Sequence, residues 1–169
     1  DNEAYMNTGI QRSSSTPWGA WTTTTPVLTP ESSPNKDMLA ILAAHRVPYA
    51  ATCCVSYPDD LIAKVTKAKE MKGTRFLQIL APCPPGWKYQ DEDSIQIGRM
   101  AVQNRIFPLM EVEDGARWRF TVDHRGDPVE PYIKKQGRFR HLKDWQIAKI
   151  QSDVNERWRV LENRVKYGT

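Results

Sequence analysis

From residue 35 onward, apolar positions recur in a pattern that predicts helices and strands in alternation. An apolar run that follows the potential capping residue Asn35 predicts a helix over 36–46. The short apolar stretches 47–55 and 75–81 predict strands, with an amphipathic helix between them that ends near Gly73. Brief connections between such elements are typical of parallel strands joined by helices. We therefore expect a parallel α/β sheet.

The helix between the two strands is expected to begin at a Ser56 cap, with Pro58 in its first turn. Its apolar residues share one face at helical spacing. The lysines lie elsewhere on the helix, and we interpret them as a solvated face. The apolar residues are Leu61, Ile62, Val65, Ala68 and Met71, and the lysines are Lys64, Lys67, Lys69 and Lys72.

The carboxyl-terminal part of the chain predicts three further features. A helix is expected over roughly 92–104. The apolar-rich segments 107–113 and 116–122 flank an Asp-Gly pair that starts at Asp114, which is typical of a β-hairpin. Apolar residues at helical spacing then predict a long helix over about 142–166. Such a helix must bury its apolar seam against this chain or a partner.

Before these elements lies a segment rich in serine, threonine and proline, residues 13–34. Its prolines and hydroxyl side chains disfavour a long helix or a central strand there. A flexible linker is one interpretation, but it would leave Trp18 and Trp21 in water. We favour an ordered loop that packs on the body of the protein.

Composition narrows the class of protein. The 169 residues, 40% hydrophobic and 26% charged, suffice for one globular unit and are too few to expect two. The longest apolar run is far shorter than the roughly 20 residues that a membrane span needs. No basic and then apolar leader opens the sequence, so the expected compartment is the cytoplasm. The net charge of +4 arises from 24 basic and 20 acidic residues, a mixture that does not by itself indicate nucleic-acid binding.

The three cysteines do not suggest a disulfide framework, because their number is odd and two of them are adjacent. Cys53 and Cys54 lie in a predicted apolar strand, where cysteine serves as a small hydrophobic residue. Cys83 lies in a proline-rich turn after the second predicted strand. In parallel α/β sheets, functional residues commonly lie at the carboxyl ends of the strands, so Cys83 is a candidate functional residue.

The opening segment, Asp1 to Gly9, holds acid and amide side chains and can add backbone carbonyls. Oxygen donors of this kind suit a hard cation such as Mg²⁺. The other interpretation is a turn rich in asparagine and glycine, which composition alone favours.

The same segment resembles the thiamine diphosphate and magnesium segment in β subunits of the 2-oxoacid:ferredoxin oxidoreductases, of which pyruvate synthase is the best-known type. The resemblance extends over nearly the whole chain, and the opening and cysteine motifs are its most specific parts. The matching motifs are Asp1-Asn2-Glu3-Ala4-Tyr5-Met6-Asn7-Thr8-Gly9, Thr16-Pro17-Trp18-Gly19, Val47-Pro48-Tyr49-Ala50-Ala51-Thr52, Tyr57-Pro58-Asp59-Asp60-Leu61, Leu80-Ala81-Pro82-Cys83-Pro84-Pro85-Gly86-Trp87 and Gln136-Gly137-Arg138-Phe139.

The resemblance implies an α/β thiamine-diphosphate-binding fold, with a parallel sheet flanked by helices, a C-terminal hairpin and a long helix. It also implies the carboxyl-terminal part of a longer subunit, because the family's aspartate ligand to magnesium and three of its four cluster cysteines lie upstream of the matching residues. Residues 1–125 would be the C-terminal part of the cofactor-binding domain. Residues 126–169 would be a helical tail that packs on that domain or on a partner subunit.

By the same resemblance, the side chain of Asn2 and the carbonyl oxygen of Ala4 coordinate the Mg²⁺ that holds the cofactor's diphosphate. Asn7 approaches the thiazolium ring and the substrate, which makes it the predicted catalytic residue. Tyr5 and Thr8 complete the predicted cofactor-binding set.

Cys83 matches the last of four thiolates that hold a [4Fe–4S] cluster in the family, and one thiolate alone cannot hold a cluster. The other interpretation is a small buried thiol in a turn. Cys53 and Cys54 match no ligand of the family, so we keep their interpretation as small hydrophobic residues.

The implied function is oxidative decarboxylation of a 2-oxoacid, pyruvate or a related acid, to acyl-coenzyme A and CO₂, with electron transfer to ferredoxin. The expected partners are α-, γ- and δ-type subunits of the same enzyme, ferredoxin, the 2-oxoacid and coenzyme A, with neither nucleic acid nor membrane. An NAD-linked or non-oxidative relative that also uses thiamine diphosphate is an alternative.

A basic cluster near the carboxyl end gives a second alternative. We interpret it as a solvated or subunit-facing patch, and docking of an acidic ferredoxin is a sharper interpretation. A nucleic-acid-binding module is disfavoured because Asp127, Glu130 and Asp144 flank the cluster. The cluster consists of Lys134, Lys135, Arg138, Arg140, His141 and Lys143.

Overall fold

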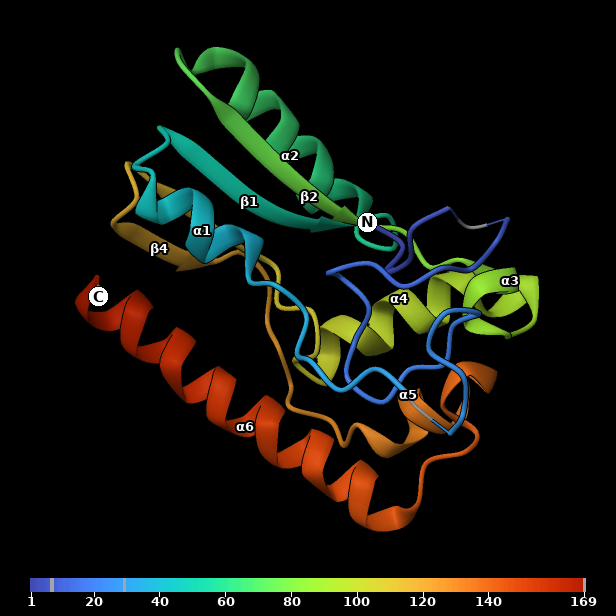
Figure 1. Ribbon diagram of the computed structural model, residues 1–169. Coiled ribbons are helices and arrows are strands. Elements are labelled where there is room, and N and C mark those ends of the chain that lie inside the picture. Colours follow the sequence, from blue (N-terminus) through green and yellow to red (C-terminus); the bar gives the residue numbers. More distant parts are fainter. Residues whose placement is uncertain (7, 29, 169) are drawn as a thin grey trace.

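The computed structural model describes residues 1–6, 8–28 and 30–168 of the chain. Its centre is a four-stranded sheet in the order β2-β1-β3-β4 (Figure 1). The strands are β1 (Tyr49–Cys54), β2 (Arg75–Leu80), β3 (Met110–Glu113) and β4 (Arg117–Phe120).

Helices surround the sheet and extend beyond it, and the predictions of helices over 92–104 and 142–166 are confirmed by α4 and α6. None of the helices in the described part of the chain is long and apolar enough to cross a membrane. The helices are α1 (Met38–Ala44), α2 (Pro58–Glu70), α3 (Pro84–Trp87), α4 (Ser94–Gln103), α5 (Glu130–Lys134) and α6 (Asp144–Tyr167), with short 3₁₀ helices η1 (Asp91–Asp93) and η2 (Gly137–Phe139).

The sheet is mixed. Strands β1 and β2 are parallel, with Tyr49 opposite Arg75 and Cys54 opposite Leu80, and α2 forms the crossover between them. The predicted hairpin is present as β3 and β4, and it joins the other edge of β1 in antiparallel orientation. The expected parallel arrangement therefore holds for the β1–β2 pair only. Periodicity along the sequence does not show which strands become neighbours, so it could not predict the antiparallel edge.

Helices cover β1 on both faces of the sheet. Ala50 packs on one face with Leu39 of α1 and Leu161 of α6. Tyr49 and Ala51 lie on the opposite face, which α2 covers. This division follows from the period of two along a strand.

A further apolar cluster lies beyond the carboxyl ends of β1 and β2. It joins Cys54 and Leu80 at the strand ends to Trp87 of α3 and Ile147 of α6. The long helix α6 therefore packs on this chain's own body, where it also contacts β4. The predicted division after residue 125 stays a prediction.

The proline-rich segment 13–34 packs on the body in its described residues, as expected. The Trp21 backbone N–H donates a hydrogen bond to the Arg138 carbonyl at 2.9 Å. The Lys88 ammonium lies 3.2 Å from the centroid of the Trp21 ring. Both Trp18 and Trp21 are half-buried.

Two helix caps differ from the prediction. Asp37 rather than Asn35 caps α1, since its carboxylate accepts a backbone N–H of the first turn at 3.1 Å. The residue at the cap of α2 is Tyr57, and the hydroxyl of Ser56 is buried with no hydrogen-bond partner among the described residues. A sequence offers several capping residues within one turn, and tertiary packing selects among them.

Candidate functional site

The opening residues lie against the carboxyl end of β2. The Asp1 carbonyl accepts the Ala81 N–H at 2.8 Å, and the Asp1 nitrogen lies 2.6 Å from the Ile79 carbonyl oxygen. This alternation is the hydrogen-bond pattern of a parallel neighbour. The Asp1 carboxylate also accepts a hydrogen bond from the Gln78 amide at 2.6 Å. Figure 1 shows the first residue at the tip of β2.

Side chains from elsewhere hold the backbone of residues 2–4. The Trp87 indole N–H donates to the Asn2 carbonyl at 2.8 Å, and the Thr16 hydroxyl donates to the Glu3 carbonyl at 2.8 Å. Glu3 has a φ of +59°, which is uncommon for a residue other than glycine. Within the described part of the chain, the Asn2 side-chain oxygen receives only a long contact of 3.4 Å from the Ala4 N–H. No hydrogen bond among the described residues ends on the Ala4 carbonyl.

The next residues form a closed loop. Tyr5 and Gln11 exchange two backbone hydrogen bonds, of 2.8 and 3.0 Å, which close the loop between them. Tyr5 and Thr8 are exposed, so their side chains are accessible to a ligand or a partner. Asn7, the predicted catalytic residue, lies outside the described residues.

Cys83 lies directly after β2, at the cap of α3, and is half-buried. A Cβ atom built on Gly86 would lie 3.3 Å from the Cys83 Sγ and 3.5 Å from the Ile10 Cδ1. The side chain of Ile10, in the closed loop, therefore meets the cysteine turn around Gly86. The structure brings the opening loop and Cys83 together at one end of the sheet.

These residues fit part of a magnesium site. Mg²⁺ prefers oxygen ligands and is usually held by one or two protein groups together with phosphates and water. The Asn2 amide and the Ala4 carbonyl are donors of that kind within one turn. In the described part of the chain, no three or more His, Cys, Asp or Glu side chains are arranged to hold a metal ion. The remaining ligands of such an ion would therefore come from other groups.

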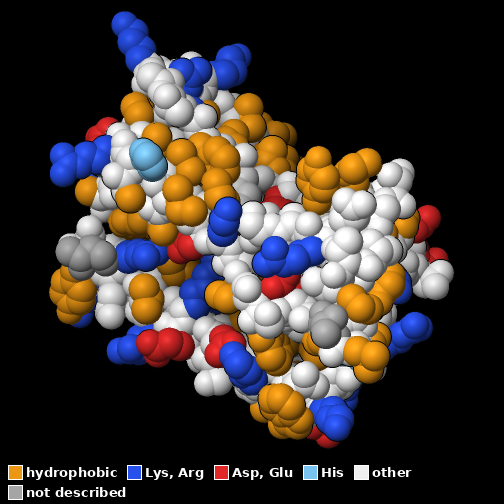
Figure 2. Space-filling view, viewed as in Figure 1, with side chains coloured by type: hydrophobic (Ala, Val, Ile, Leu, Met, Phe, Trp, Pro, Cys, Tyr) orange, Lys and Arg blue, Asp and Glu red, His pale blue; other side chains and the backbone are white. Residues whose placement is uncertain are grey.

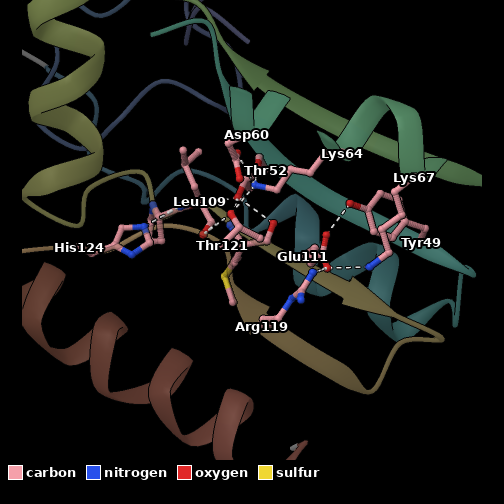
Figure 3. A network of polar contacts seen from close by, with 12 residues as sticks. Tyr49, Thr52, Asp60, Lys64, Lys67, Leu109, Glu111, Arg119, Thr121 and His124 are labelled. Carbon is pink, nitrogen blue, oxygen red and sulfur yellow. Dashed lines mark hydrogen bonds and ion pairs between the residues drawn. The ribbon is translucent and has the colours of Figure 1, made fainter. Parts of the chain in front are cut away.

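A cavity of about 900 Å³ between α2, α4 and the hairpin is a second candidate site, with a polar network along its wall (Figure 3). Its central side chain is Lys64, which is 2% exposed. The Lys64 ammonium donates to the Thr52 carbonyl at 2.7 Å, to the Asp60 carboxylate at 2.6 Å and to the Thr121 hydroxyl at 2.7 Å. All three of its protons are therefore used within the protein.

Glu111 of β3 forms the other half of this network. Its carboxylate accepts hydrogen bonds from the Tyr49 hydroxyl and the Lys67 ammonium, each at 2.7 Å, and from Arg119. Burial alone would raise the pKa of Glu111, but these three donors outweigh it and hold the pKa below its ordinary value. Burial raises the pKa of Tyr49, and the hydrogen bond to Glu111 adds to the effect.

Because the charged groups of this network have partners, we interpret it as a structural link between α2 and the hairpin rather than as a ligand site. It corrects the interpretation of the helix lysines as one solvated face. Lys64 is buried and Lys67 is half-buried, whereas Lys69 and Lys72 are exposed as expected. The hairpin that covers the Lys64 position comes from distant sequence, so the helical period could not reveal the burial.

The predicted basic cluster is likewise smaller than expected. Arg138 is 2% exposed and bonded to Glu3 at 2.6 Å, so it is not part of any surface. Lys135 pairs with Asp93 at 2.9 Å. On the face shown in Figure 2, lysine and arginine side chains are scattered among acidic, polar and apolar ones. The remaining exposed members of the cluster are Lys134, Arg140 and Lys143.

The interpretation of the adjacent cysteines is confirmed. Cys53 and Cys54 are fully buried in β1. Burial raises the pKa of the Cys53 thiol to about 11, which keeps it protonated and unreactive near neutral pH.

Sequence reasoning missed the side chains that shape the opening segment. Arg138, Trp87 and Thr16 all contact residues 2–3, yet each lies at least a dozen residues away along the chain. All three residues do fall in the matching motifs, and this was the one signal in the sequence that could have marked them. Only the tertiary structure assigns them their contacts.

Comparisons with known proteins show which proteins this chain is similar to. Residues 1–79 match the family described as thiamine pyrophosphate enzyme, C-terminal TPP binding domain, where thiamine pyrophosphate is another name for thiamine diphosphate. The fold and this match define an α/β protein of the thiamine-pyrophosphate-binding class.

Individual relatives narrow the class. Pyruvate synthase subunit PorB of Methanocaldococcus jannaschii is 51% identical over 165 residues, which cover 95% of this chain and 55% of that subunit. Ketoisovalerate oxidoreductase subunit VorB of Pyrococcus horikoshii is 46% identical over 170 residues, covering 96% of this chain and 54% of that subunit. The chain is similar to these oxidoreductase subunits over nearly its whole length, as the resemblance indicated. It spans about half the length of the curated relatives that it matches.

Replacing Lys64 tests the structural interpretation of the cavity network. Lys64→Met should lower the free energy of unfolding by about 3 kcal/mol, because it leaves the Asp60 carboxylate without its cationic partner in a largely buried position. Lys69→Met on the exposed side of the same helix is the matched control and should change it by less than about 0.5 kcal/mol. Urea denaturation gives both values, and equal effects of the two substitutions would contradict the interpretation.

His124 makes the stability depend on pH. Its Nε2 accepts the Leu109 N–H at 2.8 Å, and its ring lies against Phe120 and Trp158. Burial, with a smaller contribution from the charge of Arg105, lowers the pKa of His124 to about 4. A proton therefore binds the unfolded chain more readily than the folded one.

The contribution of His124 should be complete above pH 6.5, the ordinary pKa, and should be lost as pH falls toward about 4. The total loss should be about 3 kcal/mol, because each pKa unit corresponds to 1.36 kcal/mol. Measuring the free energy of unfolding between pH 4 and 7 for the protein and for His124→Gln shows whether the variant has the flatter profile. His45→Gln, at an exposed histidine, should keep the original slope.

Proposed function

We propose that this chain is the carboxyl-terminal part of a β-type subunit that oxidatively decarboxylates a 2-oxoacid to acyl-coenzyme A and CO₂. In this proposal, electrons leave through a [4Fe–4S] cluster to ferredoxin. The related subunits carry the names pyruvate synthase and ketoisovalerate oxidoreductase, so pyruvate and branched 2-oxoacids are the substrates to test.

One observation carries the proposal: the oxygen donors of residues 2–4 and the cysteine turn meet at the carboxyl end of β2. The Asp1 backbone pairs with this strand end, and the Trp87 indole joins the cysteine turn to Asn2. Ile10 of the opening loop and the Cys83 sulfur both lie next to Gly86. A cofactor held by the loop would therefore lie close to a cluster ligand, as short-range electron transfer requires.

Bound thiamine diphosphate supplies the decarboxylation chemistry, and an iron–sulfur cluster supplies one-electron transfer. The residues of this chain bind and orient these groups. The Asn2 amide oxygen and the Ala4 carbonyl would ligate Mg²⁺, whose charge offsets that of the diphosphate. Tyr5 and Thr8 would contact the cofactor from the exposed loop, and Asn7 would approach the substrate as the catalytic residue.

Cys83 would supply one of four thiolates to the cluster, so the other three must come from residues outside this sequence. We also assign the activity to an assembly that includes α-, γ- and δ-type subunits, because the relatives are named as subunits of larger enzymes. Coenzyme A and ferredoxin complete the proposed set of partners, and nucleic acid has no part in it.

The overall test is an assay of the complete enzyme, purified without oxygen. Reduction of a low-potential acceptor should require both a 2-oxoacid and coenzyme A, and the preparation should contain iron and thiamine diphosphate. A preparation with thiamine diphosphate and no iron, or one that reduces NAD⁺ instead, would move the assignment to a non-oxidative or NAD-linked relative.

Asn2→Ala should raise the Mg²⁺ concentration that half-saturates thiamine diphosphate binding by about tenfold or more, because it removes a ligand oxygen. Titration calorimetry of the complete enzyme measures this concentration. Asn163→Ala, at an exposed position of α6, is the matched control and should leave it unchanged. If both variants bind magnesium and cofactor equally well, Asn2 is no ligand.

Cys83→Ala in the complete enzyme should lower the iron content and abolish acceptor reduction, while thiamine diphosphate binding persists. Loss of one thiolate leaves the cluster without its full set of four. Cys53→Ala is the matched control, because that thiol is buried in β1 and should affect neither property. Full iron content and activity in Cys83→Ala would show that Cys83 is merely structural.

A further inference from the structure

Glu3 is the residue between the two proposed magnesium ligands, and its carboxylate is bound by an arginine from the other end of the chain. The Glu3 Oε2 lies 2.6 Å from a terminal guanidinium nitrogen of Arg138. The two side chains are 5% and 3% exposed, so the ion pair is buried. The ion pair is therefore separated from solvent, next to the proposed magnesium ligands.

The same guanidinium is also linked to Asn2, through the Trp87 ring. Its central carbon lies 3.9 Å from the centroid of the Trp87 ring, which is a cation–π contact. The Trp87 indole in turn donates its N–H to the Asn2 carbonyl at 2.8 Å. Arg138 therefore contacts Glu3 directly and restrains Asn2 through Trp87.

Arg138 is itself fixed in place. Its Nε donates to the Gln136 side-chain oxygen at 2.9 Å, and the Gln136 amide donates to the Tyr132 carbonyl at 2.8 Å. Gln136 is fully buried. The Arg138 carbonyl accepts the Trp21 N–H at 2.9 Å. These hydrogen bonds fix the position of the Arg138 guanidinium.

A buried ion pair of this kind is weak support for stability, because apolar side chains of similar volume often do as well. It can instead impose one conformation on the chain. Here the conformation is unusual, since Glu3 has a φ of +59°. Such backbone persists where the surroundings hold it, and it is found at functional sites. Around this reversal, the Asn2 side-chain oxygen receives only the long 3.4 Å contact from Ala4, and the Ala4 carbonyl accepts no hydrogen bond, among the residues that the structure describes.

We propose that Arg138 is a positioning residue for the magnesium-binding turn: its ion pair with Glu3 and its stack on Trp87 hold Asn2 and Ala4 in the arrangement that binds the metal. This inference rests on the proposed function, because it takes Asn2 and Ala4 as magnesium ligands. Groups that orient metal ligands commonly change metal affinity by about 10- to 100-fold when they are removed.

The test compares magnesium affinity with stability in the complete enzyme. The variants are Arg138→Met, Glu3→Gln and the double variant that combines them, which removes both charges. For each, calorimetry gives the Mg²⁺ concentration that half-saturates thiamine diphosphate binding, and thermal unfolding gives the midpoint. Arg164→Met is the matched control, since Arg164 pairs with Asp37 at 3.2 Å and lies over the Trp118 ring, on other elements.

We expect Arg138→Met to lower the unfolding midpoint and to raise the required Mg²⁺ concentration by about tenfold or more. The double variant should regain most of the midpoint, because it buries no unpaired charge, but should still need the raised Mg²⁺ concentration. If Arg138→Met does not assemble, Glu3→Gln and the double variant carry the same comparison. Arg164→Met should leave the magnesium requirement unchanged.

A double variant with both the midpoint and the magnesium requirement of the original protein would overturn the inference, because the pair would then serve stability alone. An equal rise in Arg164→Met would overturn it as well, because the effect would not be specific to the turn. Failure of the proposed function has a different signature. In that case the unsubstituted enzyme itself would bind no thiamine diphosphate in the presence of Mg²⁺.

Discussion

The architecture depends on the burial of strand β1. Its residues are covered on both faces, so every backbone N–H and carbonyl along it must find a partner within the protein. The parallel strand β2 supplies these partners on one edge, and the antiparallel strand β3 supplies them on the other. The remaining arrangement follows, because α2 must cross one face while α1 and α6 cover the opposite one.

The same constraint positions the candidate site. Because β1 and β2 are parallel, their carboxyl ends lie at one end of the sheet, where Cys83 and the opening residues meet. A third segment, which precedes α6, also lies here and pairs Arg138 with Glu3. Three segments that are far apart in sequence thus meet in one small region.

Particular residues show where sequence reasoning succeeds and where it ends. The spacing of apolar residues predicted the crossover helix, the hairpin and the long helix, because each of these is a local pattern. Lys64 and Lys69 are equivalent by the same reasoning, yet one is buried under the hairpin and the other is exposed. The resemblance of the opening motif suggested Asn2 and Ala4 as magnesium ligands. It did not reveal that Thr16 and Arg138 bind Glu3.

The sequence by itself determined the order and type of the main helices and strands, the apolar nature of β1, the resemblance to a family, and the motifs that carry the candidate chemistry. Secondary structure and motifs depend on neighbouring residues, so they can be read along the chain. The tertiary structure alone decided that the hairpin joins β1, that Lys64 and Arg138 are buried, and that the cysteine turn meets the opening loop. These outcomes depend on contacts between residues that are distant in sequence, and the burial of a charged side chain is set by what packs over it.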